Sequence, residues 1–336
     1  EGVYISKDGV TLRSEKPGGA KIDPPSGKIG IAISADHITV KGFDVYGSTI
    51  SGIVGNGVHH VNVLDNIVHN NKANGILLME SDFLRVEGNV VYENASLSAR
   101  SGISIFHPKN ITGNTSNTGY RIIVKDNVSY NNQNKNGAHT DGHGIIFDDF
   151  NTNQDPKLPA YKYPSLIENN LVYRNGGAGV VVYMSENVTV RGNTAWHNNL
   201  DNNTNSTWRS ELENLDSDHV TWLNNIAVTD PKVNKYNVAI GSFSFGGDKN
   251  IDVTWSGNTT FNGSSGDASV STNNGNAGPS ASANKLGVNP GLDSSDIQSM
   301  AKSLGASTSS SASTGSANGG AAADADAGNP KSADGG

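Results

Sequence analysis

One short phrase recurs along the chain at spacings as small as 23 residues. It reads DNIVHNN at residues 65–71 and returns as GNVVYEN, DNVSYNN, NNLVYRN and GNTAWHN. In register, the copies form three columns. The first holds Asn66, Asn89, Asn127, Asn170, Asn193, Asn225 and Asn258; the second, three residues later, holds Tyr46, His69, Tyr92, Tyr130, Tyr173, Trp196, Val228 and Phe261; the third holds Asn71, Asn94, Asn132, Asn175 and Asn198. A repeat of this length is typical of a solenoid.

The local patterns identify the kind of solenoid. Short alternations of β-branched residues, such as RIIVKD and NVTVRG, precede the asparagines, and glycine-led apolar strands such as GILLM and GVVVY precede most of these. Helical periodicity is nearly absent. Two or three short strands in about 23 residues make one coil of a parallel β-helix, whose strands pair with their counterparts one coil away. We therefore predict an all-β parallel β-helix, held by an asparagine ladder beside an aromatic stack.

The repeat also sets the expected domain boundaries. It runs to about Gly263, so we predict a β-helix catalytic domain over residues 1–263. Residues 264–305 are expected to form an irregular coil or a short helix that covers the open end of the solenoid. Residues 306–336 are a low-complexity serine, glycine and alanine tail. Because the first residues read as strand, turn and strand without a cap, we expect an upstream segment.

Composition excludes several classes of partner. The net charge is −8, which argues against nucleic acid because phosphate binding needs a basic face. No apolar run approaches the roughly 18 residues that a membrane helix needs. The chain has no cysteine, so no disulfide can form. We expect a secreted, extracellular monomer that binds neither nucleic acid nor membrane.

Insertions interrupt the repeat in the middle of the chain. The intervals of the first asparagine column run 23, 38, 43, 23, 32 and 33 residues. Insertions in a solenoid become loops, which often gather on one face and build the walls of a groove. The longest are residues 108–120, 133–143, 151–166 and 199–209. Function is therefore expected beside these loops.

Alternation along the strands predicts what faces that groove. The positions expected to point inward are Ile103, Ile105, Ile145, Phe147, Val180 and Val182. The next position then points outward on successive coils and holds Phe106, Asp148 and Tyr183. The following turn holds His107, Asp149 and Met184. The nearby loops add further aromatic and ionisable residues. These are Arg100, Tyr120, Arg121, His139, His143, Lys157, Tyr161, Lys162, Tyr163, Trp208 and Arg209.

A groove of this kind suits a polysaccharide. Tyr161, Tyr163, Tyr183 and Trp208 are candidates for stacking on sugar rings, while Arg100 and Arg209 could pair with uronate carboxylates. Cleavage of a polyuronate by β-elimination needs a group that neutralises the carboxylate, a base for the C5 proton and an acid for the leaving oxygen. Tyrosine, lysine, histidine and arginine, all present here, can fill these roles.

Two stretches carry a family resemblance, HTDGHGIIFDDF at residues 139–150 and YPSLIENNLVYRN at residues 163–175. They resemble the right-handed parallel β-helix polysaccharide lyases, most of all the bacterial alginate lyases, over roughly residues 30–262. The resemblance implies a right-handed coil, an acidic polyuronate substrate with alginate before pectate, and a tyrosine and a lysine as base and acid. The candidate pairs are Tyr120 with Lys157 and Tyr183 with Lys162.

The remaining candidates complete the expected site. His143 is a further catalytic candidate, and the substrate-binding candidates are His107, Asp148, Arg209, His139, Tyr161 and Arg100. We expect no cofactor in an alginate-type lyase. The calcium-dependent β-helix pectate lyases bind metal through aspartate clusters. A resemblance of this chain to those enzymes implies that Asp141, Asp148 and Asp149 could hold Ca²⁺.

Three other functions fit the same residues. A β-helix glycoside hydrolase would use paired carboxylates, which Asp141, Asp148 and Asp149 could supply. A mannuronan C5-epimerase shares the first proton abstraction with the lyase and then returns a proton to C5. A noncatalytic glycan-binding module would need the groove without a base. Each candidate residue also has a structural alternative, such as a turn cap for Asp148 and Asp149 or a solvated loop charge for Lys157 and Lys162.

Overall fold

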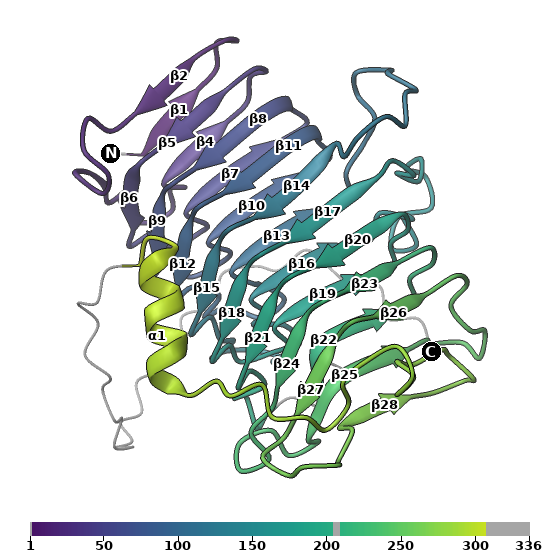
Figure 1. Ribbon diagram of the computed structural model, residues 1–336. Helices are drawn as coiled ribbons and strands as arrows, with labels where there is room; N and C mark the ends of the chain where they lie inside the picture. Colours follow the sequence, from purple (N-terminus) through teal and green to yellow (C-terminus); the bar gives the residue numbers. More distant parts are fainter. Residues whose placement is uncertain (1, 204–208, 307–336) are drawn as a thin grey trace. The chain divides into compact units, whose positions relative to one another are not determined.

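The computed structural model describes residues 2–203 and 209–306, which wind into a stack of coils with three parallel sheets (Figure 1). Sheet A contains β1 (Val3–Ile5), β4 (Ile31–Ile33), β7 (Ile53–Asn56), β10 (Ile76–Met79), β13 (Ile103–Phe106), β16 (Ile145–Asp148), β19 (Val180–Tyr183), β22 (Ser210–Leu215), β25 (Val238–Phe243) and β28 (Val270–Thr272). Sheet B contains β2 (Thr11–Arg13), β5 (Thr39–Lys41), β8 (His59–Leu64), β11 (Asp82–Glu87), β14 (Ile122–Lys125), β17 (Ser165–Glu168), β20 (Val188–Arg191), β23 (Thr221–Leu223) and β26 (Thr254–Ser256). Sheet C contains β3 (Ala20–Ile22), β6 (Phe43–Tyr46), β9 (Ile67–His69), β12 (Val90–Tyr92), β15 (Val128–Tyr130), β18 (Leu171–Tyr173), β21 (Thr194–Trp196), β24 (Ile226–Val228) and β27 (Thr259–Phe261).

The strands pair in the register that the repeat predicts. In sheet A, Ile103 pairs with Ile145, and Ile145 with Val180, on successive coils. These side chains and their neighbours two residues on are fully buried, and they join one aliphatic core that runs along the solenoid. The predicted parallel β-helix and its inward column are therefore confirmed.

The predicted asparagine ladder is also confirmed. The Asn89 Nδ2 donates to the Asn127 Oδ1 at 3.0 Å, and the Asn127 Nδ2 donates to the Asn170 Oδ1 at 2.9 Å. The Asn89 backbone N–H donates to the same Asn127 oxygen at 2.9 Å. Each amide thus satisfies backbone groups at a buried turn that would otherwise lack partners. The second ladder ends at Glu211, whose carboxylate accepts the Asn198 side-chain N–H.

The aromatic stack lies on the outer face of sheet C. The rings of Tyr92 and Tyr130 stack at 4.9 Å, and those of Tyr130 and Tyr173 at 4.8 Å. Helix α1 (Ser294–Ser303) packs its Ile297 and Ala301 against this apolar column. In Figure 1 the helix lies along sheet C, so this part of the segment covers the side of the solenoid. The residues before it form a further coil at the end of the solenoid, where β28 pairs with β25 and Lys285 forms a bridge with Thr259. From residue 307 on, the expected tail lies outside the described residues.

The four long insertions flank the strands of sheet A. Residues 107–121 and 149–164 connect sheet A to sheet B, after β13 and β16. Residues 131–144 and 197–209 connect sheet C to sheet A, before β16 and β22. Two insertions therefore lie at each end of the sheet A strands, and the outer face of sheet A lies between them.

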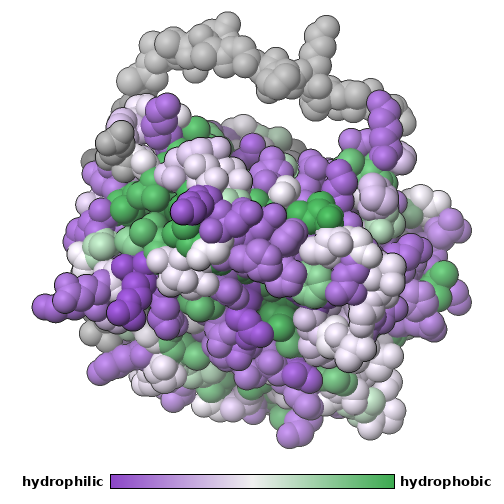
Figure 2. Space-filling view, turned by 90° about the horizontal axis from the view of Figure 1, so that it is seen from above, coloured by the Kyte–Doolittle hydropathy of each residue, from purple (hydrophilic) through white to green (hydrophobic). Residues whose placement is uncertain are grey.

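Figure 2 shows one face of the molecule, where hydrophilic side chains are interrupted by small hydrophobic patches. No helix among the described residues is long and apolar enough to cross a membrane.

Candidate functional site

A groove with a volume of about 670 Å³ lies on the outer face of sheet A. Successive strands supply its floor, from Val54 on β7 through Phe106 on β13 to Tyr183 on β19. The insertion before β16 contributes Asp141, and the insertion after it contributes Gln154. Across the four steps from β7 to β19, a strand spacing of about 4.8 Å gives the floor a length of roughly 19 Å. Two of the four predicted insertions therefore reach the groove, whereas no described residue of the insertions at 108–120 and 199–209 lines it.

The predicted outward column occupies the groove. Phe106 pairs with Asp148 in the adjacent strand, and Asp148 pairs with Tyr183 in the next. All three side chains are half-buried and line the groove. Phe245 approaches the edge of the Tyr183 ring at a centroid distance of 6.4 Å. The site therefore places one carboxyl group between two aromatic rings.

Two carboxyl groups in the groove have perturbed acidities. Burial raises the pKa of Asp148 well above its ordinary value, and the negative charges of Asp141 and Asp149 raise it further. The Gln154 Nε2 donates to the Asp148 Oδ1 at 3.2 Å. Burial also raises the pKa of Asp141 to about 6, although the side chain of Thr140 and the charge of Arg100 oppose this shift. A neighbouring pair with different pKa values is suited to acid–base chemistry.

Asp149 and His107 support the groove from outside it. Asp149 is fully buried and accepts the backbone N–H groups of Asn153 at 2.7 Å and Gln154 at 2.9 Å. It also pairs with the His107 Nε2, and the His107 ring stacks on Phe106. Neither residue lines the groove. Asp149 therefore anchors the turn that presents Gln154 to Asp148.

His143 lies in the packing between two coils. It is fully buried, and its Nδ1 accepts the Ala178 backbone N–H at 3.0 Å. Burial lowers its pKa to about 3, so the ring is neutral across the ordinary pH range. The structure places this expected catalytic residue outside the groove, where it orders the chain beside β19.

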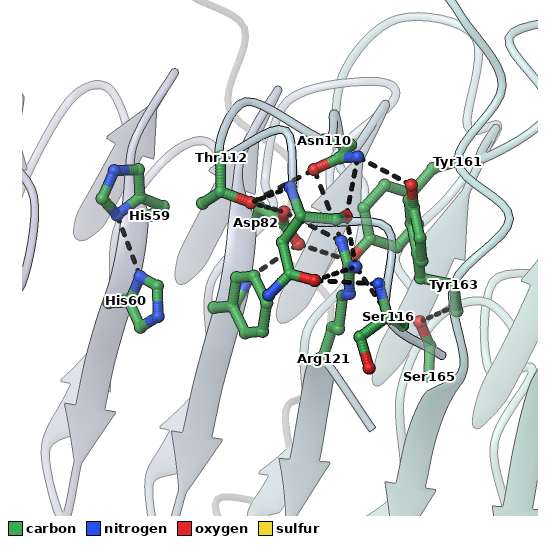
Figure 3. Close-up of polar contacts among 12 residues, drawn as sticks. His59, His60, Asp82, Asn110, Thr112, Ser116, Arg121, Tyr161, Tyr163 and Ser165 are labelled. Atoms are coloured by element: carbon green, nitrogen blue, oxygen red, sulfur yellow. Dashed lines mark hydrogen bonds and ion pairs between the residues drawn. The ribbon is translucent and has the colours of Figure 1, made fainter. Parts of the chain in front are cut away.

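Tyr161 and Tyr163 belong to a polar cluster that holds two insertions against sheet B (Figure 3). Tyr161 is 1% exposed, and its hydroxyl donates to the Asp82 Oδ1 at 2.6 Å. The Arg121 guanidinium lies 3.4 Å from the centre of the Tyr163 ring and forms an ion pair with Asp82 at 3.3 Å. The Asn110 Nδ2 donates to the Tyr163 hydroxyl at 2.7 Å. These tyrosines, expected to stack on sugars, are thus engaged inside the protein.

The expected tyrosine and lysine pairs do not meet in the groove. Tyr120 donates its hydroxyl to the Thr189 Oγ1 on β20, at 3.3 Å, on the side of sheet B. The Lys162 Nζ pairs with the Glu186 Oε1 at 3.3 Å, and Lys157 is exposed on its loop. Of these four residues, only Tyr183 lines the groove.

The remaining predicted residues lie along the insertions. The His139 Nδ1 pairs with the Asp201 Oδ2 at 2.6 Å, and the Arg209 guanidinium lies 4.6 Å from the centre of the Tyr236 ring. Neither lines the groove, whereas exposed Arg100 does. Trp208 lies outside the described residues.

The three aspartates proposed for calcium do not converge. Within residues 2–203 and 209–306, the only group of three or more histidine, aspartate or glutamate side chains with ligand atoms within 4.8 Å of one another is His37, His59 and His60. The Asp149 carboxylate instead accepts hydrogen bonds from the backbone N–H groups of Asn153 and Gln154.

Sequence reasoning missed several residues of the groove. Leu77, Ser104 and Ile146 lie on its floor, and Gln154 contacts Asp148 directly. The three floor residues occupy outward positions of their strands, so the same alternation that selected Asp148 could have found them. Gln154 had no comparable signal because it lies on a loop.

The three parallel sheets and the ladder define the chain as a right-handed parallel β-helix, and the comparisons agree. A family model described as a right handed beta helix region matches residues 1–118. Among solved structures, the alginate lyase from Paenibacillus sp. str. FPU-7 is similar, with a TM-score of 0.51, 15% identity, and coverage of 82% of this chain and 79% of that chain. The mannuronan C-5 epimerase AlgE6 A-module from Azotobacter vinelandii gives a TM-score of 0.49, 18% identity, and coverage of 79% and 73%. A search of curated proteins found no match. At these identities the likeness shows the fold.

Proposed function

We propose that this protein cleaves a polysaccharide bound along the groove of sheet A, with Asp148 as the proton donor. The position of Asp148 carries the proposal. Its carboxyl group lies between Phe106 and Tyr183 in one column of the groove floor, and its raised pKa favours the protonated form. The groove is long enough for a polymer, and aromatic rings supply flat apolar surfaces against which sugar rings can pack.

Hydrolysis is the reaction that the two carboxyl groups support best. A glycosidase needs one carboxylic acid to protonate the leaving oxygen and one carboxylate to act as base or nucleophile. Asp148, whose pKa is raised well above its ordinary value, fits the acid, and Asp141, with a pKa of about 6, fits the carboxylate. The charged side chains that line the described groove are Arg100, Asp141 and Asp148. With Asp148 protonated, the charges of Arg100 and Asp141 balance, so the described lining carries no net positive charge, which favours a neutral glycan.

A second reaction, β-elimination of a polyuronate, is favoured by Arg100. Its guanidinium lines the groove near Asp141 and could pair with a uronate carboxylate. Asp141 would then remove the C5 proton, and the Tyr183 hydroxyl would protonate the leaving oxygen. The Paenibacillus protein of similar fold is named as an alginate lyase, so alginate is the first polyuronate to test and pectate the second. A polymeric substrate also suits the secreted, extracellular location that we propose.

One assay separates these reactions. The purified protein is incubated with alginate, polymannuronate, polyguluronate, pectate and neutral glucans, while new reducing ends and the ultraviolet absorbance of unsaturated sugars are both recorded. Hydrolysis raises reducing ends alone, whereas elimination raises both signals. Altered NMR spectra without cleavage would indicate an epimerase, and binding without either change would indicate a glycan-binding module.

A matched pair of variants tests the role of Asp148. Asp148→Asn removes the proposed acid, and Asp252→Asn removes an exposed carboxylate outside the groove. We expect loss of cleavage only in Asp148→Asn. Equal activity in wild type and Asp148→Asn would overturn the proposal.

A further inference from the structure

Three histidines from two successive coils meet at the edge of sheet B. His37 precedes β5, while His59 and His60 begin β8. Each histidine offers one ring nitrogen, and these three nitrogens lie within 4.8 Å of one another. The Nδ1 atoms of His59 and His60 are 2.9 Å apart (Figure 3). None of the three residues lines the groove of sheet A. The cluster is therefore separate from the proposed active site.

Backbone conformation brings the neighbouring side chains together. Successive residues of a strand normally point to opposite faces, so His59 and His60 would diverge in a regular strand. His60 instead has a φ of 55°, and His37, at the same turn one coil earlier, has a φ of 57°. The rings of His37 and His60 consequently stack at 4.7 Å. The His37 N–H also donates to the His59 carbonyl at 3.0 Å, which ties the two coils at this point.

Asp36 orients the third ring. Its Oδ2 lies 3.2 Å from the His59 Nε2, while its Oδ1 accepts the His59 backbone N–H at 2.8 Å. A proton on Nε2 facing this carboxylate leaves a lone pair on Nδ1, which faces His60. A carboxylate that holds the outer nitrogen of a histidine in this way is the common support of a metal ligand. The nearby Asp82 carboxylate is already occupied by Arg121 and Tyr161.

We propose that His37, His59 and His60 bind one divalent transition metal ion of the zinc class. Three imidazole nitrogens select zinc, copper or nickel over calcium and magnesium, which prefer oxygen ligands. At Zn–N distances of about 2.0–2.1 Å, tetrahedral geometry places ligand nitrogens roughly 3.3 Å apart. The stacked rings of His37 and His60 must therefore turn toward a common ion when it binds. The exposure of His37 and His60 leaves a fourth position accessible to water. The ion would link two coils of the solenoid.

The test is metal binding by the untagged full-length chain after treatment with a chelator. Calorimetric titration with Zn²⁺ should give one equivalent per chain, and Co²⁺ should give the visible absorption of a tetrahedral site. The double variant His37→Ala/His60→Ala should lose both signals. His219→Ala, which removes a partly exposed histidine in the turn before β23, should retain both.

Stability supplies a second readout. Zn²⁺ should raise the thermal midpoint of the wild type and of His219→Ala, because an ion that binds only the folded state stabilises it. It should leave the midpoint of the double variant unchanged. If the double variant fails to fold, the single variant His37→Gln replaces it in the test. This milder change of an exposed ring should weaken Zn²⁺ binding at least tenfold. No binding by the wild type, or equal binding by wild type and His37→Gln, would overturn the proposal.

Discussion

Asp148 and Tyr183 are register partners on β16 and β19, so a carboxyl group and a phenol rise from the groove floor about one strand spacing apart. Burial raises the pKa of both groups, and the carboxylate of Asp148 adds to the shift of Tyr183. The raised pKa keeps both groups in the protonated form that a proton donor needs, so either can supply the proton for a leaving oxygen.

Substitution of Asp148 should separate catalysis from stability. Asp148→Asn should lower kcat by roughly 10²–10⁴-fold, the usual contribution of a positioned general acid. It should leave the thermal midpoint at pH 7 unchanged or higher, because the variant removes a carboxyl group whose ionised form is disfavoured by burial. Steady-state kinetics and thermal melts check this. A parallel loss of activity and stability would mean that Asp148 has a structural role.

Hydrolysis should show a bell-shaped pH profile of kcat/KM. The rate should rise with pH as Asp141 ionises near its pKa of about 6, and fall at higher pH as Asp148 loses its proton. Arg100 lowers the pKa of Asp141, so Arg100→Gln should move the rising limb to higher pH. A rising limb that stays in place in Arg100→Gln would exclude Asp141 as the group that titrates.

Glu211 should make stability depend on pH. Burial raises its pKa from 4.5 to about 8, so the folded state holds this proton more tightly than the unfolded state. The resulting stability is complete below about pH 4.5 and is lost as the pH rises through about 8. Glu211→Gln keeps an oxygen that can accept from Asn198 and removes the ionisation.

Thermal melts at pH 5 and pH 8.5 measure this effect. The wild type should lose several degrees more than Glu211→Gln over this interval. Glu15→Gln, at an exposed position, should behave as the wild type does. An equal loss in wild type and Glu211→Gln would show that another group controls the pH dependence.

Loss of the hydroxyl group should lower the stability of the protein at Tyr161 and the rate of the reaction at Tyr183. Tyr161→Phe removes the bond to buried Asp82 and should cost about 1–3 kcal/mol of unfolding free energy, without a large change in KM. Tyr183→Phe removes the hydroxyl of a residue that lines the groove. It should lower kcat if β-elimination is the reaction, because the hydroxyl is then the acid. Denaturant unfolding and steady-state kinetics on the same preparations distinguish the two residues. A KM increase confined to Tyr161→Phe would indicate that the Tyr161 ring contacts the substrate.

The sequence alone determined the coil, the ladder and the outward column. Each of these depends on a short local pattern, and parallel pairing one coil away brings like positions together. The alignment of Phe106, Asp148 and Tyr183 in one column therefore follows from the spacing of the repeat. The end of the second ladder was less visible because Glu211 takes the place of an asparagine there.

Only the tertiary structure decided which insertion residues face the groove. Tyr161 bonds to Asp82, 79 residues away in the sequence, and this distant contact turns its ring into the protein. His143 and Asp149 are likewise placed by backbone groups of the neighbouring coil or turn. The convergence of His59 and His60 required a positive φ that strand periodicity does not encode. Loop side chains lack a repeating partner, so their directions follow from contacts that form only when the coils are stacked.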